Sequence, residues 1–280
     1  MNAAPNAKLT ERPIGVFDSG MGGLTVMRAL MAHLPREGFV YLGDTARLPY
    51  GSKSAETVTR YAVQCAGVVA AHGIKLLVVA CNTASAVALP ALEWALAPTP
   101  VIGVIEPGAE AAVAAAPAGR IAVIATEGTV AGGAYVRAIH ARNPNATVTQ
   151  QACPLFVALA EEGLTEGPIA EGIAARYLEP LLRNAARPEC LVLGCTHYPP
   201  LSATIARVAG AGVKLVDSAD TTAASVAKLL EANGLARTGA AAAPPKFLAT
   251  DAPERFARVG EIFLGKKIDV GSVELVDLQR

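Results

Sequence analysis

The chain has 280 residues, of which 52% are hydrophobic and 17% are charged, with 24 acidic and 24 basic side chains. This composition is typical of a globular protein with a substantial core and excludes an intrinsically disordered chain. The zero net charge and the lack of a basic run argue against nucleic acid or an anionic membrane as the main partner.

Residues 1–12 are polar and lack the apolar stretch of a signal peptide. No apolar run approaches the roughly 18 residues that span a bilayer. We therefore expect a cytoplasmic protein without a membrane anchor. The five cysteines are odd in number and show no CxxC spacing, so we expect free thiols and no disulfide framework.

The first part of the chain alternates short apolar runs with helical patterns. The runs predict strands at 14–17, 39–42, 76–80 and 101–105, and the longer periodic segments predict helices at 24–34 and 54–72. Polar or glycine-rich residues follow every strand: Asp18-Ser19-Gly20-Met21-Gly22-Gly23, Gly43-Asp44, Cys81-Asn82-Thr83 and Glu106-Pro107-Gly108. The glycine turn is not GxGxxG and no Walker lysine follows it, so it does not indicate a nucleotide site.

The pattern then restarts about 110 residues later, which is one typical domain length. Strands are predicted at 121–124, 147–152, 190–194 and 213–216, with helices from about Val130 and up to Glu162. After a helix at 221–233 and a connector at 238–245, the tail predicts a strand at 246–251, a helix at 253–264 and a strand at 272–278. The fold class is therefore two pseudo-symmetric α/β domains with mostly parallel sheets that face one another. We expect residues 13–108 plus 220–280 to form the first domain and residues 109–219 the second.

Two strands carry matching cysteine motifs. In Leu77–Ser85 an apolar run is followed by Cys81-Asn82-Thr83. In Leu191–Pro199 an apolar run is followed by Cys195-Thr196-His197. The carboxyl ends of parallel strands are where α/β proteins bind ligands. Each cysteine is expected to precede a helix, which would lower the pKa of its thiol. Cys65 and Cys190 are interpreted as core residues, and Cys153 as a packing or pocket-lining residue.

Four chemistries could use the matched pair. Disulfide redox needs the two sulfur atoms within bonding reach, which a substrate-sized gap would prevent. Zinc needs more ligands than His197, the only histidine near either motif. Acyl transfer could use Cys195 with His197 but leaves Cys81 without a role. Proton exchange at a carbon acid uses both thiols, one on each face of the carbon.

Longer motifs add a resemblance to a known family. Four of them, Asp18–Val26, Tyr41–Gly51, Ala80–Ser85 and Leu193–Pro199, resemble glutamate racemase, of the aspartate/glutamate racemase superfamily. Shorter matches at 104–107, 125–129 and 153–156 follow in the same order, so the resemblance covers about residues 14–218. It implies a cofactor-independent homodimeric enzyme without a metal, whose active site lies in the cleft between the two domains. The implied reaction interconverts L- and D-glutamate and supplies D-glutamate for peptidoglycan.

The resemblance also implies roles for individual residues. Cys81 and Cys195 would be the acid/base thiols, assisted by Asp18 and His197 respectively, with Glu161 and Asp44 as further helpers. Substrate contacts would fall on Asp18, Ser19, Tyr50, Gly51, Asn82, Thr83, Thr126, Thr129, Thr196 and His197. Ala131-Gly132-Gly133 lacks a serine expected in relatives, so no substrate contact is expected there. No lysine stands at a strand end, where a pyridoxal Schiff base would need it.

Three other functions remain open at this point. The first is a racemase of the same superfamily that acts on aspartate or a hydantoin. The second is a cysteine hydrolase or transferase built on Cys195 and His197. The third is a two-lobed amino-acid sensor without turnover, which the absence of an export signal disfavours.

Overall fold

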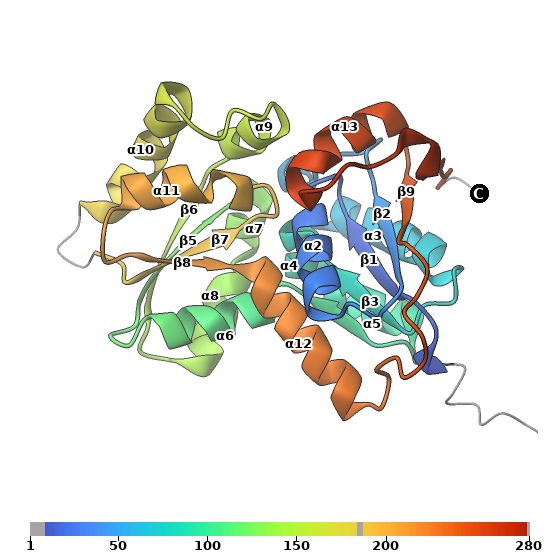
Figure 1. Cartoon of the computed structure of the whole chain (residues 1–280). Helices are drawn as coiled ribbons and strands as arrows, with labels where there is room; N and C mark the ends of the chain where they lie inside the picture. Colours follow the sequence, from blue (N-terminus) through green and yellow to red (C-terminus); the bar gives the residue numbers. More distant parts are fainter. Residues whose placement is uncertain (1–8, 184–186, 279–280) are drawn as a thin grey trace, which may run out of the picture.

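The computed structural model describes residues 9–183 and 187–278, which form two α/β lobes (Figure 1). The six-stranded lobe contains a sheet with the order β10 (Val273–Leu275), β9 (Lys246–Ala249), β2 (Phe39–Gly43), β1 (Ile14–Asp18), β3 (Leu76–Val79), β4 (Val101–Gly103). The four-stranded lobe contains a sheet with the order β6 (Thr147–Ala152), β5 (Arg120–Ala125), β7 (Cys190–Gly194), β8 (Lys214–Asp217). Every described strand pair is parallel, so the predicted fold class is confirmed.

Helices cover both faces of each sheet, which explains the unbroken apolar runs of β1, β2, β3 and β7. In the six-stranded lobe these are α2 (Leu24–His33), α3 (Ala55–Ala70), α4 (Asn82–Val87), α5 (Leu89–Leu96) and α13 (Pro253–Leu264), with short 3₁₀ turns at Tyr50–Ser52 and Val270–Ser272. In the four-stranded lobe they are α7 (Glu127–Gly132), α8 (Ala134–Arg142), α9 (Leu155–Glu161), α10 (Pro168–Leu182) and α11 (Ser202–Ala209), with a 3₁₀ turn at Pro199–Leu201.

Two helices, α6 (Ile105–Ala115) and α12 (Ser218–Ala232), connect the lobes along the chain. Figure 1 shows α12 running from the four-stranded lobe beneath α2. One hydrophobic cluster includes Val16 of β1, Val226 and Leu230 of α12, and Leu193 of β7, so the core is continuous between the lobes. The predicted boundaries at 108/109 and 219/220 lie inside these two helices and stay a prediction.

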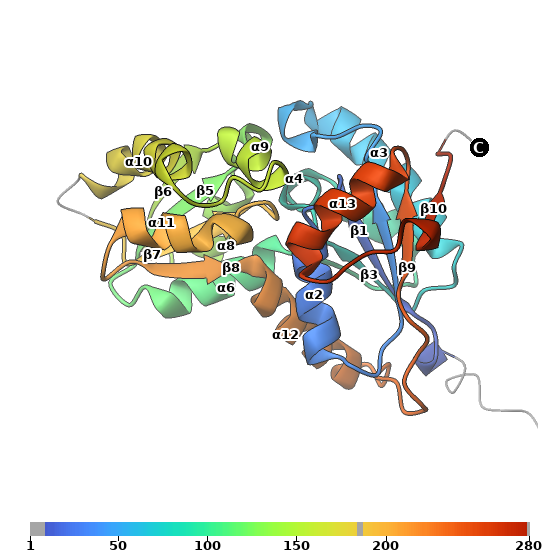
Figure 2. The same ribbon diagram turned by 45° about the horizontal axis from the view of Figure 1, so that its top comes forward.

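The tail returns to the first sheet, as its predicted strand and helix suggested. Strand β9 pairs with β2 in the register Leu42↔Leu248, and β10 pairs with β9. Helix α13 then packs against α2. Figure 2 shows α13 beside α9 of the opposite lobe, so this late segment reaches the junction between the lobes.

Several element boundaries differ from the sequence-based prediction. The helix expected from Val130 is split into α7 and α8 by Gly133, which adopts a left-handed conformation (φ 60°). Strand β4 ends at Gly103, so Glu106-Pro107-Gly108 belongs to the first turn of α6 and is not a strand-end loop. The last strand is shorter than predicted, since it covers only Val273–Leu275.

Within the described residues no helix is long and apolar enough to cross a membrane.

A buried ion pair fastens the end of α12 to the six-stranded lobe. Lys75, with 1% of its surface exposed, lies 2.6 Å from the Glu37 carboxylate. Its ammonium also donates hydrogen bonds to the carbonyl oxygens of Thr10 (2.7 Å) and Leu235 (2.8 Å). The pair therefore joins three segments that are far apart in the sequence.

We expect Lys75→Met to lower the free energy of unfolding by about 3–5 kcal/mol, because Glu37 would stay buried without its cation. Urea denaturation at neutral pH measures this. The matched control is Arg183→Ala, which breaks the exposed pair with Glu179 and should change stability little. If both variants unfold at the same urea concentration, the Lys75 pair does not stabilise the fold as described.

Candidate active site

The carboxyl ends of β1, β3, β5 and β7 meet at one small cavity between the lobes. Its volume is about 30 Å³, close to the share of one water molecule in the liquid. The lining residues are Ser19, Pro49, Tyr50, Gly51, Cys81, Asn82, Thr83, Thr126, Val157, Cys195, Thr196 and His197. Both matched cysteines thus line one cavity, one from each lobe.

The structure brings the sequence-predicted site residues together. All of them line the cavity except Asp18, Asp44, Thr129 and Glu161, and each of these four interacts with a residue that does. Asp44 accepts a hydrogen bond from the Tyr50 hydroxyl. Asp18 acts electrostatically on Cys81, the Thr129 hydroxyl lies 3.2 Å from that of Thr83, and Glu161 binds His197. A larger cavity of about 290 Å³ adjoins the first and shares Pro49, Gly51, Thr126 and Val157 with it.

Cys81 caps the amino terminus of α4. Its sulfur accepts the Ala84 N–H (3.5 Å) and donates toward the Ser19 hydroxyl (3.5 Å). The expected fall in thiol pKa is wrong for this residue, because burial and then the Asp18 carboxylate raise the pKa of Cys81 to about 12. The capping N–H opposes the rise but is the weaker effect. Cys81 is therefore a protonated thiol at neutral pH.

Cys195 was expected to precede a helix directly, and the structure shows that it does not. It enters a turn followed by the 3₁₀ helix at Pro199–Leu201, and α11 begins only at Ser202, so no helix terminus points at this sulfur. Instead, the Cys195 sulfur lies 3.9 Å from Nδ1 of His197. The electrostatic partner of Cys195 is thus a side chain.

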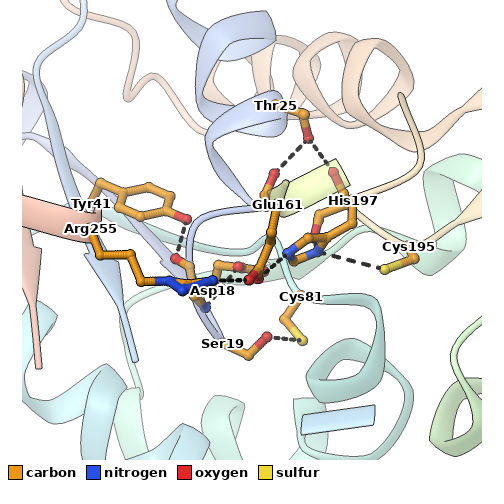
Figure 3. A network of polar contacts seen from close by, with 12 residues as sticks. Asp18, Ser19, Thr25, Tyr41, Cys81, Glu161, Cys195, His197 and Arg255 are labelled. Carbon is orange, nitrogen blue, oxygen red and sulfur yellow. Dashed lines mark hydrogen bonds and ion pairs between the residues drawn. The ribbon is translucent and has the colours of Figure 1, made fainter. Parts of the chain in front are cut away.

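His197 is held from its other side by two further residues (Figure 3). Its Nε2 lies 3.1 Å from Glu161 Oε1, and Arg255 of α13 donates to Glu161 Oε2 at 2.7 Å. Although burial alone would lower the pKa of His197, the contacts with Cys195 and Glu161 raise it to about 10. Burial would raise the pKa of Glu161, but His197 and, to a lesser extent, Arg255 hold it below its ordinary value. An imidazolium therefore stands beside Cys195.

Two polar atoms in this region are buried and without a hydrogen-bond partner among the described residues. They are Oδ1 of Asp18 and Nδ2 of Asn82. Their other ends are occupied, since Asp18 Oδ2 accepts the Gly20 N–H (2.9 Å) and Asn82 Oδ1 accepts the Tyr135 O–H (2.7 Å). Leaving such groups unpaired costs about 1–3 kcal/mol each. One acceptor and one donor beside the two thiols are therefore left without a partner among the described residues.

The remaining polar groups divide between the ligand site and its support. Thr83, Thr126 and Thr129 bring their hydroxyls within 3.0–3.2 Å of one another. Tyr50 gives its hydroxyl hydrogen to Asp44 at 2.5 Å, so it lines the cavity with its ring. Asp44 also binds Arg47 (2.7 Å) and Thr250 (2.9 Å), which makes it the anchor of the loop that carries Tyr50 and Gly51.

Glycine is required where the lobes approach most closely. A Cβ on Gly22 would lie 2.4 Å from Nδ1 of His197 and 2.5 Å from the Thr196 hydroxyl oxygen. A Cβ on Gly51 would lie 2.6 Å from Cβ of Thr126. These contacts join opposite lobes, so the two glycines allow the cavity to close.

Several supporting residues were not predicted from the sequence. Arg255 binds Glu161 and Tyr135 binds Asn82, in each case from the opposite lobe. Thr25 donates to the Thr196 carbonyl at 3.3 Å. The tail carries no recognised motif, and the only signal for Arg255 is its place just after the end of β9. All five cysteines are free and buried, as expected; Cys65, Cys153 and Cys190 pack in the core.

The fold and the site place this chain in the class of two-lobed α/β proteins whose binding site lies between the lobes. The family model described as Asp/Glu/Hydantoin racemase matches residues 14–226, and the chain belongs to this family.

Individual relatives agree over nearly the whole chain. A curated glutamate racemase from Geobacter metallireducens is 51% identical over 265 residues, which cover 94% of this chain and 97% of the relative. The crystal structure of glutamate racemase from Francisella tularensis in complex with D-glutamate superposes with a TM-score of 0.89 at 38% identity, covering 96% of this chain and 99% of that one. The enzyme from Thermus thermophilus, in complex with beta-chloro-D-alanine, gives 0.86 at 45% identity, with 96% and 98% covered.

We expect Gly22→Ala to reduce turnover strongly, because the new methyl group would displace the His197 ring from Cys195. The matched control is Gly67→Ala on α3, where an added Cβ meets nothing within 4 Å; it should keep full activity. Steady-state kinetics with thermal unfolding compares the two. Normal turnover of folded G22A would show that the contact does not set the His197 position.

Glu161→Gln should lower the pKa of His197 from about 10, because it removes the carboxylate that favours the imidazolium. A folded-state pKa above the ordinary 6.5 contributes stability in full below pH 6.5, and this contribution is lost as the pH rises to about 10. E161Q should therefore lose stability most below pH 6.5 and show a flatter decline between pH 6.5 and 10.

NMR titration of the His197 ring protons gives the pKa, and denaturation at several pH values gives the stability. The control is Glu171→Gln, which breaks the exposed pair with Arg207 and leaves the histidine alone. An unchanged His197 pKa in E161Q would contradict the assignment.

Proposed function

We propose that this chain is a glutamate racemase that exchanges the α-proton of glutamate between two cysteines, with neither metal nor organic cofactor. The observation that carries the proposal is that Cys81 and Cys195 line one cavity from opposite lobes. Inversion of a carbon needs one proton acceptor and one proton donor on opposite faces. The identity with curated glutamate racemases, up to 51% over 94% of the chain, supports glutamate as the substrate.

The two thiols start from different charge environments. The His197 imidazolium beside Cys195 stabilises the negative charge of a thiolate there. Cys81, whose pKa is about 12, holds a proton. In one direction of the reaction Cys195 therefore removes the α-proton, and Cys81 delivers its own proton to the opposite face of the same carbon.

The reverse direction needs a thiolate at Cys81. Burial raises the pKa of Asp18, which lies beside Cys81. The Asp18 carboxylate repels charge on the neighbouring sulfur, so its protonation governs how readily Cys81 becomes a thiolate. Asp18 and His197 thus serve matching purposes, each adjusting the charge next to one thiol.

Substrate recognition follows from the unpaired groups. Oδ1 of Asp18 can accept a hydrogen from the substrate ammonium, and Nδ2 of Asn82 can donate to a carboxylate. The hydroxyls of Ser19, Thr83, Thr126 and Thr196 add further donors around the cavity. No cation is required, because hydroxyl and amide donors satisfy a carboxylate.

The difficult step is formation of carbanion character at Cα. Fixed dipoles in a site without water stabilise developing charge more strongly than the same dipoles in solution. The cavity of about 30 Å³ is small for an amino acid, and we propose that the lobes separate to admit substrate and close around it. The adjoining 290 Å³ cavity, lined by Leu48, Pro154 and Val157, offers the route of entry.

We further propose that the enzyme works in the cytoplasm as a homodimer and supplies D-glutamate for peptidoglycan. These proposals rest on the family resemblance of the motifs.

One observation favours a second function. Cys195, His197 and Glu161 form a chain in which a nucleophile, a base and an orienting carboxylate are in contact, as in thiol hydrolases and transferases. In such an enzyme Cys81 would have no chemical role.

The test is incorporation of solvent deuterium at Cα of each glutamate enantiomer by metal- and pyridoxal-free protein. Cys81→Ser and Cys195→Ser should each reduce racemisation at least about 100-fold, because each removes one proton carrier. Each should still eliminate the leaving group from one enantiomer of a β-substituted substrate, since elimination needs only one base. The matched control is Cys190→Ser, a buried thiol outside the cavity.

Retained racemisation in folded C81S would contradict the two-cysteine mechanism. Absence of α-proton exchange in the wild type, together with thiol-dependent hydrolysis or transfer that C81S retains, would favour the thiol hydrolase or transferase. Exchange with aspartate or a hydantoin but not with glutamate would assign the chain to another racemase. Binding of glutamate without exchange would indicate a sensor.

A further inference from the structure

Asn82 stands where substrate recognition and lobe closure meet. It is the first residue of α4, has 2% of its surface exposed and lines the cavity next to Cys81. An amide has a donor end and an acceptor end that differ little in shape. Only the donor end is useful toward a carboxylate, so the rotation of this amide has a functional consequence.

Tyr135 fixes that rotation in the structure. This residue belongs to α8 of the four-stranded lobe, and its hydroxyl donates to Asn82 Oδ1 at 2.7 Å. With Oδ1 engaged, Nδ2 is directed elsewhere and has no partner among the described residues. The bond crosses from one lobe to the other, so it exists only while the two lobes are in contact.

The Tyr135 ring is itself held in place. It is fully buried, and a Cβ on Gly194 would lie 3.1 Å from Cε2, while one on Gly108 would lie 3.2 Å from Cε1. Burial raises the pKa of Tyr135, against a hydrogen bond from Ser218, so the phenol keeps its proton and remains a donor at neutral pH. In the structure this hydrogen is given to Asn82 Oδ1, and that contact leaves the NH₂ end of the amide directed away from Tyr135.

We propose that Tyr135 is a positioning residue which, on lobe closure, turns the Asn82 amide so that its NH₂ group faces a carboxylate of the substrate. The inference rests on the proposed function, since it takes an amino acid as the ligand. Without Tyr135 the amide can present its oxygen to the carboxylate, which replaces an attractive contact by a repulsive one. Closure and recognition are then linked through one hydrogen bond.

A double-mutant cycle on Tyr135→Phe and Asn82→Ala tests the proposal. Y135F removes one oxygen atom and should lower kcat/KM for glutamate about tenfold, the effect of one hydrogen bond to a charged group. In the N82A background the same change should alter kcat/KM less than about twofold, because the group that Tyr135 positions is absent. Equal effects in both backgrounds, or none in either, would overturn the proposal.

Tyr198→Phe is the matched control. Tyr198 is equally buried, and its hydroxyl donates to the Cys153 carbonyl at 2.9 Å. Its loss should combine additively with N82A, whereas Y135F and N82A should not be additive. A purely structural role of Tyr135 predicts additivity for both tyrosines.

Asn82→Asp provides a second arm that does not depend on the folding of Y135F. The aspartate still accepts the Tyr135 hydrogen but cannot donate to the substrate. We expect a lower melting temperature, because the new carboxylate is buried without a cation, and a loss of kcat/KM at least as large as in N82A. Wild-type activity of N82D would refute the donor role. Wild-type protein that fails to exchange the α-proton of glutamate would instead remove the proposed function itself.

Discussion

The close approach of the two lobes is the constraint on which the site depends. Gly22 lies against His197, and Gly51 lies against Thr126, at distances that leave no room for a side chain. Contact at the level of the backbone reduces the shared cavity to about 30 Å³. Charges buried in the protein act on one another more strongly than they would in water. Burial raises the pKa of Cys81, whereas the pKa of His197 is raised against burial by its contacts with Cys195 and Glu161.

The scaffold is nearly symmetric, but the electrostatics of the two thiols are opposite. A buried carboxyl, Asp18, acts on Cys81, whereas the His197 imidazolium stands beside Cys195. The imidazolium is in turn maintained by Glu161, whose second oxygen binds Arg255. The proposed transfer of a proton from one face of a carbon to the other would profit from this difference between the surroundings of the two thiols.

The positions of the strand-end residues could be predicted from the sequence because parallel strands deliver their carboxyl ends to one edge. Apolar runs ending in Cys81 and Cys195 therefore located the site. The pKa of Cys81 could not be predicted, since the local helix end is visible in the sequence but the burial that outweighs it is a tertiary property. The return of β9 to β2, which brings Arg255 to Glu161, likewise depends on long-range pairing. Gly133 ends a helix through its left-handed backbone, whereas the sequence pattern continues through it.

Three hydrogen bonds between the lobes orient residues of the candidate site. Arg255 of α13 binds Glu161 of α9, Tyr135 of α8 binds Asn82 of α4, and Thr25 of α2 binds the Thr196 carbonyl. Asn82 and Thr196 directly follow the two cysteines in the chain, and Glu161 binds His197, which lies beside Cys195. Each of the three contacts would be lost if the lobes parted. An open enzyme would keep both cysteines. It would lose the ion pair between Glu161 and Arg255, and the Asn82 amide would no longer be held by Tyr135. In the proposed mechanism, the contacts that orient these residues would therefore form in the same step that excludes water from the reacting carbon.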